Sequence, residues 1–268
     1  MKRGLTDTAI LIVLLAGIFW SFGALVVRFI EDARSVPWQY LFFRGFTIFI
    51  LINFYLFIRE GKSFIKNYKR IGASGILGGI SLGIAMMCFI WSITHTTAAV
   101  TLLMLAAMPF MTAILGYIFL KEKVSKTTLI AIVVAAIGII FMALSSRQIG
   151  TLFGLIVGLI SALGFSFFSV SLRWKKNTPT FTTVAVAGLF CGTFSFFVLI
   201  FSDANFFTTF RNSSLSALHG TLVCSGMILY SLGSKHLPAA DLTLLSLTEV
   251  LGGIFWVWRR CAKYRYIP

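Results

Sequence analysis

The stretch TTAAVTLLMLAAMPFMTAILGYIFLKEK, residues 96–123, decides the fold because its pattern occurs a second time near the C-terminus. The second copy reads LPAADLTLLSLTEVLGGIFWVW, residues 237–258, and the alignment places Met108 opposite Glu249. Internal repeats of this length in an apolar chain are typical of transporters, whose solute site lies between the two halves near the middle of the bilayer.

The repeat continues upstream of these two stretches. Ser21 and Arg28, in FWSFGALVVRF, match Ser166 and Arg173, in GFSFFSVSLRW. The pair Arg44-Gly45 matches Ala187-Gly188, in a register that has drifted slightly. A slow drift of register is expected of two copies whose loops differ slightly in length.

The composition predicts a membrane protein. Apolar residues make up 58% of the chain, charged residues 12%, and the mean hydropathy is +0.94. Soluble proteins carry about 25% charged residues, and one membrane span needs roughly 20 apolar residues. We expect an all-α, polytopic membrane helix bundle with nine candidate spans, at residues 8–29, 37–58, 72–94, 97–119, 127–145, 151–172, 180–201, 213–234 and 239–258.

The spans divide the chain into three parts. Residues 1–147 form a first repeat of five spans, residues 148–258 form a second repeat of four spans, and residues 259–268 form a basic tail. Because the first repeat has an odd number of spans, the second begins on the opposite side of the membrane. The two repeats are therefore expected to have inverted topology.

The formal charge of +15 comes from the connections between spans rather than from a basic surface interleaved with aromatic residues, so we expect no nucleic-acid partner. The positive-inside rule places the N-terminus in the cytoplasm of a plasma (inner) membrane protein. One side carries Lys2, Arg3, Arg59, Lys62, Lys66, Lys69, Arg70, Lys121, Lys123, Lys126, Arg173, Lys175, Lys176 and Lys235, and the other carries Arg28, Arg34, Arg147 and Arg211.

The sequence predicts neither a cofactor nor a metal site. The four cysteines and three histidines show no metal-ligand spacing, and small free cysteines are usually buried packing residues. No GxxxxGK[ST] phosphate loop occurs, so ATP is not expected to drive this chain.

Glu249 is the sharpest functional signal because it lies near the middle of the last span. Holding an ionised carboxylate there costs roughly 2.5–3.5 kcal/mol unless it is paired or protonated. Thr243 and Ser246 precede it at spacings of three, so we expect one polar stripe that faces a central cavity. Glu249 is interpreted as the residue for solute contact or for a coupling proton, with a structural role as the alternative.

Arg44 is the second charge inside a span. An unpaired guanidinium that faced lipid would be costly, so we expect it to be buried against the bundle. Contact with the solute remains one alternative, and an ion pair or a snorkelling side chain that sets helix register is the other, with equal weight. Gly75, Gly79 and Gly83 recur on one face of the third span, where small residues allow close helix packing. Pro109, inside the fourth span, is expected to kink that helix.

These residues carry a family resemblance. The chain resembles the EamA-like branch of the drug/metabolite transporter superfamily, whose members have ten spans in two five-helix repeats. The resemblance covers residues 8–258 and rests on Trp20-Ser21-Phe22, the lone Arg44, the AAxxxLLxxLxP run that ends at Pro109, the following LKEK and the AADLTLLSLTEV echo. It implies a secondary carrier of small organic metabolites. Trp20 and Ser21 are further candidates for solute contact, with core or lipid packing as the alternative role of Trp20, favoured by the 15% aromatic content of the chain.

The end of the chain departs from this family pattern, because RRCAKYRYIP follows Trp258 where a tenth span is expected. Two alternatives to the carrier therefore stay open, an integral-membrane enzyme and a transport-inactive truncated protein. As a carrier, the protein acts by alternating access around a site at mid-membrane. Its expected partners are a small-molecule solute, a coupling proton as an option, membrane lipid and, as a further option, a second copy in a homodimer.

Overall fold

The computed structural model describes residues 2–145, 151–175 and 178–264, and every regular element in these ranges is a helix. The elements are α1 (Lys2–Val27), α2 (Pro37–Glu60), η1 (Gly61–Phe64), α3 (Ile65–Arg70), α4 (Gly72–His95), α5 (Ala98–Leu105), α6 (Met108–Leu120), α7 (Lys126–Ser145), α8 (Leu152–Trp174), α9 (Thr180–Phe201), α10 (Phe210–Gly233), α11 (Ala239–Leu245) and α12 (Thr248–Tyr264). The predicted helix bundle is confirmed.

The predicted spans lie on helices of the structure. By length and composition, eight helical segments of the described chain can cross a membrane. The predicted fifth span is α7, a further helix of 20 residues. α12 continues to Tyr264, past the predicted end of the last span at Trp258. The predicted boundary at residues 147 and 148, and tail residues 265–268, lie outside the described residues.

The faces of the bundle suit a lipid environment. Large apolar side chains lie on the outside, among them Leu11, Ile50, Ile58, Ile130 and Leu251. Inside the bundle, hydrogen bonds between buried hydroxyls join helices. The hydroxyl oxygens of Ser169 and Tyr230 are 2.7 Å apart, and those of Ser92 and Thr101 are 3.0 Å apart. Lipid supplies no hydrophobic drive between helices, so such bonds and close packing hold the bundle together.

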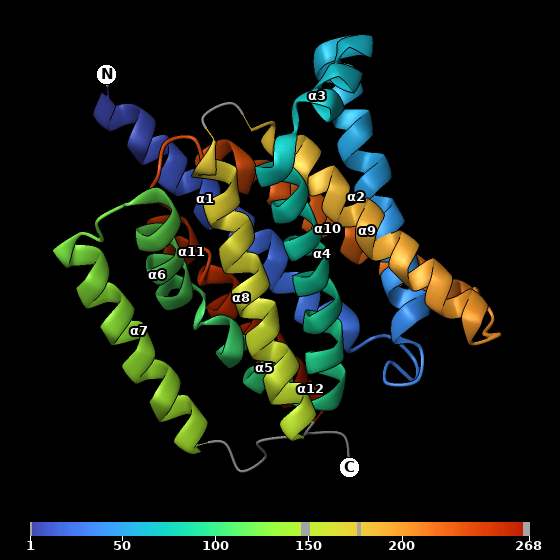
Figure 1. Cartoon of the computed structure of the whole chain (residues 1–268). Coiled ribbons are helices and arrows are strands. Elements are labelled where there is room, and N and C mark those ends of the chain that lie inside the picture. Colours follow the sequence, from blue (N-terminus) through green and yellow to red (C-terminus); the bar gives the residue numbers. More distant parts are fainter. Residues whose placement is uncertain (1, 146–150, 176–177, 265–268) are drawn as a thin grey trace.

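Corresponding helices of the two halves run in opposite directions. In Figure 1, α1 runs from the N-terminus down the bundle whereas α8 runs up, and α2 runs up whereas α9 runs down. The packing pattern also maps onto itself when the halves are exchanged. α4 packs on α8 as α10 packs on α1, α4 packs on α9 as α10 packs on α2, and α6 packs on α8 as α12 packs on α1.

α2 and α9 correspond to each other and pack directly together. Gly45 and Gly188 lie at their contact: a Cβ on Gly45 would come 2.5 Å from the backbone nitrogen of Gly192 and 2.9 Å from the carbonyl oxygen of Gly188. The glycines predicted to pack the third span behave similarly, since a Cβ on Gly79 would lie 2.8 Å from the Thr183 carbonyl oxygen of α9.

The fourth and last spans are each broken near the middle. The fourth divides into α5 and α6, and the last into α11 and α12. The fourth span is thus interrupted directly before Pro109, the residue that the sequence singled out for a kink. Pro109 lies in the first turn of α6, where its missing N–H costs no helical hydrogen bond. The break before α12 occurs without a proline, at Ser246 and Leu247.

Candidate functional site

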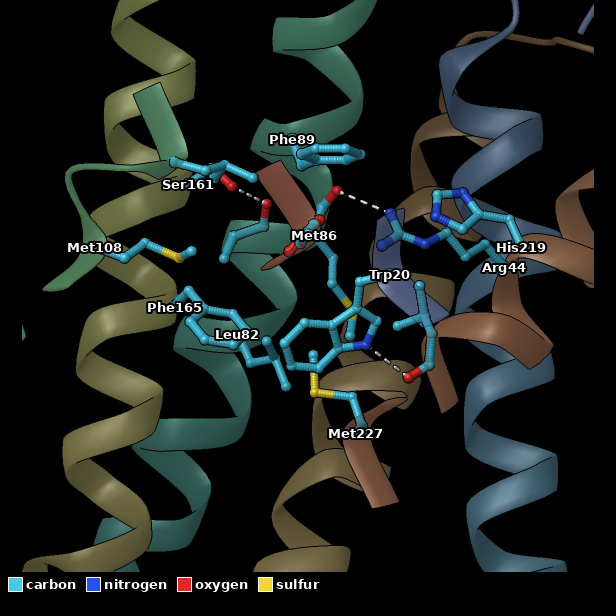
Figure 2. A pocket seen from close by; sticks show the side chains of 14 residues that line it. Trp20, Arg44, Leu82, Met86, Phe89, Met108, Ser161, Phe165, His219 and Met227 are labelled. Atoms are coloured by element: carbon cyan, nitrogen blue, oxygen red, sulfur yellow. Dashed lines mark hydrogen bonds between the residues drawn. The ribbon is translucent and has the colours of Figure 1, made fainter. Parts of the chain in front are cut away.

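A central cavity lies where the two broken spans meet the rest of the bundle (Figure 2). Its volume is about 50 Å³. That is room for a few water molecules, since one needs roughly 10–15 Å³, but not for a drug-sized ligand, whose pockets span about 300–1,000 Å³. The lining residues are Trp20, Arg44, Leu82, Ala85, Met86, Phe89, Leu105, Met108, Ser161, Phe165, His219, Val223, Met227 and Glu249.

Arg44 is held in the cavity wall by α2, which begins at Pro37. Only 5% of Arg44 is exposed, so the prediction that it is buried is confirmed. Its Nη1 donates a hydrogen bond to the carbonyl oxygen of Met86 at 3.3 Å, drawn as a dashed line in Figure 2. Its Cζ lies 6.0 Å from the centre of the Phe89 ring. Within the described chain, its Nε has no hydrogen-bond partner.

Glu249 reaches the cavity because α12 begins beside it, at Thr248. A carboxylate in the first turn of a helix is stabilised by the positive end of the helix dipole. Of the residues that the structure describes, the pairs within ion-pair distance are Arg173–Glu122 and Arg211–Glu31, so Glu249 and Arg44 do not pair directly. The cavity thus holds one guanidinium and one carboxyl side chain without a salt bridge between them.

Met108 and Glu249 occupy equivalent positions in the two halves. Each lies at the start of the second helix of a broken span, and each lines the cavity. The same place in the repeat thus supplies an apolar side chain from one half and a charged one from the other. The helix break makes this possible, because it brings the first turn of α6 and the first turn of α12 to the middle of the bundle.

His219 is a cavity residue that the sequence did not single out. It lies on α10, is 2% exposed, and shares a hydrogen bond between its Nδ1 and the hydroxyl of Tyr40. Gly23 leaves room for the ring, because a Cβ there would come 2.5 Å from Nε2 of His219. Figure 2 shows His219 beside Arg44. No signal in the sequence distinguishes His219 from the other two histidines.

Trp20 lies in the cavity wall, as the sequence interpretation allowed. Its Nε1 donates to the carbonyl oxygen of Val223 at 3.3 Å, and its ring packs edge-on against Phe165 with ring centres 5.5 Å apart. These contacts fix the indole between α1, α8 and α10. The tryptophan therefore presents a rigid apolar surface to the cavity.

Thr243, Ser246 and Ser21 are buried but do not line the cavity. The Thr243 hydroxyl donates to the carbonyl oxygens of Ala239 and Ala240. The Ser246 hydroxyl donates to the backbone carbonyl oxygen of Thr243. The Ser21 hydroxyl donates to the backbone carbonyl oxygen of Ile18 and accepts a hydrogen bond from Nε1 of Trp256. The expected stripe assumed one continuous helix, whereas the structure interrupts the helix at Ser246 and Leu247, and of these three residues Glu249 is the one that lines the cavity.

A polar network joins the two halves at one end of the bundle. Nε of Arg173 lies 2.8 Å from Oε1 of Glu122, and Oε2 of Glu122 accepts a hydrogen bond from the Ala239 backbone N–H at 3.2 Å. Arg173 also donates to the carbonyl oxygens of Ser234 and Leu237. We call this network the latch. Glu122 follows the C-terminal end of α6 and Arg173 lies in the last turn of α8, and in Figure 1 both of these helix ends lie at the end of the bundle where the N-terminus is.

A second cavity, of about 60 Å³, lies beside the latch and is lined by Thr112, Glu122 and Asp241, among others. Asp241 accepts a hydrogen bond of 2.6 Å from the Thr128 hydroxyl. Within the ranges that the structure describes, no group of three or more His, Cys, Asp or Glu residues is placed to hold a metal ion.

Comparisons with known proteins agree with this architecture. Residues 7–144 match the model of the EamA-like transporter family. An uncharacterized transporter of Helicobacter pylori (strain J99) is 23% identical over 255 residues, which cover 91% of this chain and 83% of that protein. The uncharacterized transporter YojE of Bacillus subtilis (strain 168) is 24% identical over 259 residues, covering 91% and 80%. Protein LicB of Haemophilus influenzae is 25% identical over 231 residues, covering 81% and 74%.

Proposed function

Because the chain belongs to the EamA-like transporter family, we propose that this membrane transporter is a secondary carrier, which moves a small organic metabolite by alternating access around the central cavity. The assigned membrane is the plasma (inner) membrane, with the N-terminus in the cytoplasm. This orientation follows from the basic residues, which gather in the connections on the N-terminal side.

The observation that carries the proposal is the presence of Arg44 and Glu249 in one cavity without a salt bridge between them. A charge inside a membrane protein is costly, so such residues are rare, and those that occur mark solute or ion pathways. Arg44 lies on α2, which packs against α9 of the other half, and Glu249 lies at the start of α12, directly after the break in the last span. Discontinuous helices around a central site are a recurring feature of secondary transporters.

The closed cavity implies that its walls move during transport. A volume of about 50 Å³ cannot admit an organic solute from either side. In alternating access, one repeat rocks against the other around the fixed site. The latch closes one route, and the contact between α2 and α9 supplies a place where the halves stay together while they tilt. Residues 1–147 and 148–258 act in this proposal as the two moving repeats.

Counterflow in proteoliposomes tests this function without ATP. Vesicles that contain the purified full chain are loaded with unlabelled amino acids, amines or nucleosides, and one labelled member of the same class is added outside. A carrier is expected to accumulate the label transiently, because the unlabelled solute leaves while labelled solute enters. Protein-free vesicles are the control. If none of the three classes moves through protein whose helical circular dichroism is intact, the proposed function is wrong and the transport-inactive alternative holds.

A further inference from the structure

We infer that the solute of the central cavity is a zwitterion, which places its anionic group on Arg44 and its cationic group on Glu249. This inference rests on the proposed carrier function and names the class of solute. It follows from the charges that the cavity holds, the hydrogen bonds that they lack and the surfaces around them.

Arg44 presents unused donors to an anion. Its side chain is 95% buried, as its exposed fraction of 5% shows, and among the described residues its hydrogen bond goes to a single neutral acceptor, the carbonyl oxygen of Met86. Its Nε has no partner in the described part of the chain. Guanidinium groups bind planar carboxylates through two parallel hydrogen bonds. A solute carboxylate on Nε and a terminal nitrogen would satisfy the donor that the protein leaves unpaired.

Glu249 requires a cation for the complementary reason. Its carboxylate lines the same cavity and has no ion-pair partner in the described ranges. A buried carboxylate without a counter-charge is destabilising, whereas a paired one is tolerated. An ammonium group on the solute would provide the missing charge.

The other polar groups at the cavity do not offer alternative counter-charges. The His219 ring is already hydrogen-bonded to Tyr40, and the Ser161 hydroxyl donates to the carbonyl oxygen of Ala85 at 2.8 Å. The hydroxyls of Thr243 and Ser246 donate to the backbone outside the cavity. One positive and one negative side chain therefore remain, and a solute with one charge of each sign neutralises both.

The rest of the wall suits an apolar solute body of adjustable size. Met86, Met108 and Met227 lie around Trp20 and Phe165 (Figure 2). Methionine side chains are flexible and adapt to irregular shapes, so they can withdraw when the cavity enlarges. The indole of Trp20 also offers a face that attracts an ammonium or quaternary ammonium group.

Thermal stabilisation of the purified full chain tests the zwitterion assignment. The probes are the common amino acids, glycine betaine and carnitine. For the best binder, the matched probes are the carboxylic acid without the amino group and the amine without the carboxylate. We expect the zwitterion to bind about 10- to 100-fold more tightly than either matched probe, because each missing charge leaves one buried side chain unpaired.

Two variants test which side chain binds the carboxylate of the solute and which binds its amine. In Glu249→Gln, the amine-free acid is expected to bind as tightly as the zwitterion, and in Arg44→Gln the carboxylate-free amine is expected to do so. Glu60→Gln and Arg59→Gln are matched controls outside the cavity and should keep the wild-type preference. The wild-type comparison needs no variant, so it remains decisive even if a cavity variant folds poorly.

The inference is overturned if a singly charged probe binds the wild-type chain as tightly as its parent zwitterion, or if none of the zwitterions binds. It is also overturned if Glu249→Gln still prefers the zwitterion but loses accumulation driven by a pH gradient, since Glu249 would then carry a coupling proton. In each case, counterflow of another solute class would leave the carrier function intact. Absence of all counterflow would instead reject the carrier function itself.

Discussion

Gly45 of α2 and Gly188 of α9 occupy equivalent places in the two halves and contact each other through their backbones. A Cβ on either residue would lie 2.9 Å from the carbonyl oxygen of the other. This is closer than side chains normally approach backbone atoms, so both positions require glycine for the observed packing. The two halves therefore meet at a point where each contributes the same residue.

Enlarging this contact should destabilise the bundle. We expect Gly188→Ala to lower the free energy of unfolding by about 1–3 kcal/mol, the usual cost of overpacking, because backbone rather than a flexible side chain stands in the way. Thermal unfolding in detergent measures the effect. The control is Gly116→Ala in α6, where a Cβ would meet only Oε2 of Glu122 at 3.9 Å. Equal melting temperatures for the two variants would show that the α2–α9 contact is not tight.

Arg44→Met should separate function from stability. Replacing a buried, poorly paired charge by an unbranched apolar side chain is often neutral or stabilising, so we expect the melting temperature to stay or rise. Counterflow should be lost, because the solute has lost its anion-binding group. Arg59→Met, in the exposed end of α2, should retain counterflow. A variant Arg44→Met that transports normally would assign Arg44 a structural role.

The latch should control access from the N-terminal end of the bundle. Glu122→Gln removes the ion pair with Arg173. The side chains of Arg173 and Glu122 are 28% and 26% exposed, respectively. We expect the open population to rise roughly 5- to 30-fold, which corresponds to a loss of about 1–2 kcal/mol. The reporter is Thr112→Cys, a fully buried position beside the latch, in a chain whose four native cysteines are replaced by alanine.

The rate at which a maleimide reacts with this cysteine measures the opening. Glu31→Gln is the control because its ion pair with Arg211 is about half exposed and lies away from the second cavity. An unchanged reaction rate in Glu122→Gln would mean that the latch does not hold the bundle closed.

Cysteine labelling in intact cells should establish the orientation. Ser35→Cys lies in the connection between α1 and α2, and Lys66→Cys lies in α3, at the other end of α2. Both positions are exposed. With a cytoplasmic N-terminus, a membrane-impermeant thiol reagent should label Ser35→Cys in intact cells and Lys66→Cys only after lysis. The reverse pattern would place the N-terminus outside.

Composition and residue order were enough to predict the class of protein and the places of the spans. In lipid, every backbone polar group must be satisfied within the segment, so long apolar runs can only be helices. The cost of a guanidinium in lipid determined that Arg44 is buried, and the internal match placed Met108 opposite Glu249. These conclusions depend on composition and order along the chain, which is why they needed no coordinates.

Which polar groups share the cavity depends on how the helices pack in three dimensions. Thr243 and Ser246 donate to carbonyl oxygens within one helical turn, and this local choice cannot be read from their spacing. His219 reaches the cavity because α10 packs between α1 and α2, and the latch joins Glu122 to Arg173 across the two halves. Contacts between residues far apart in the chain depend on how whole helices cross, and hydrophobic periodicity contains no information about that.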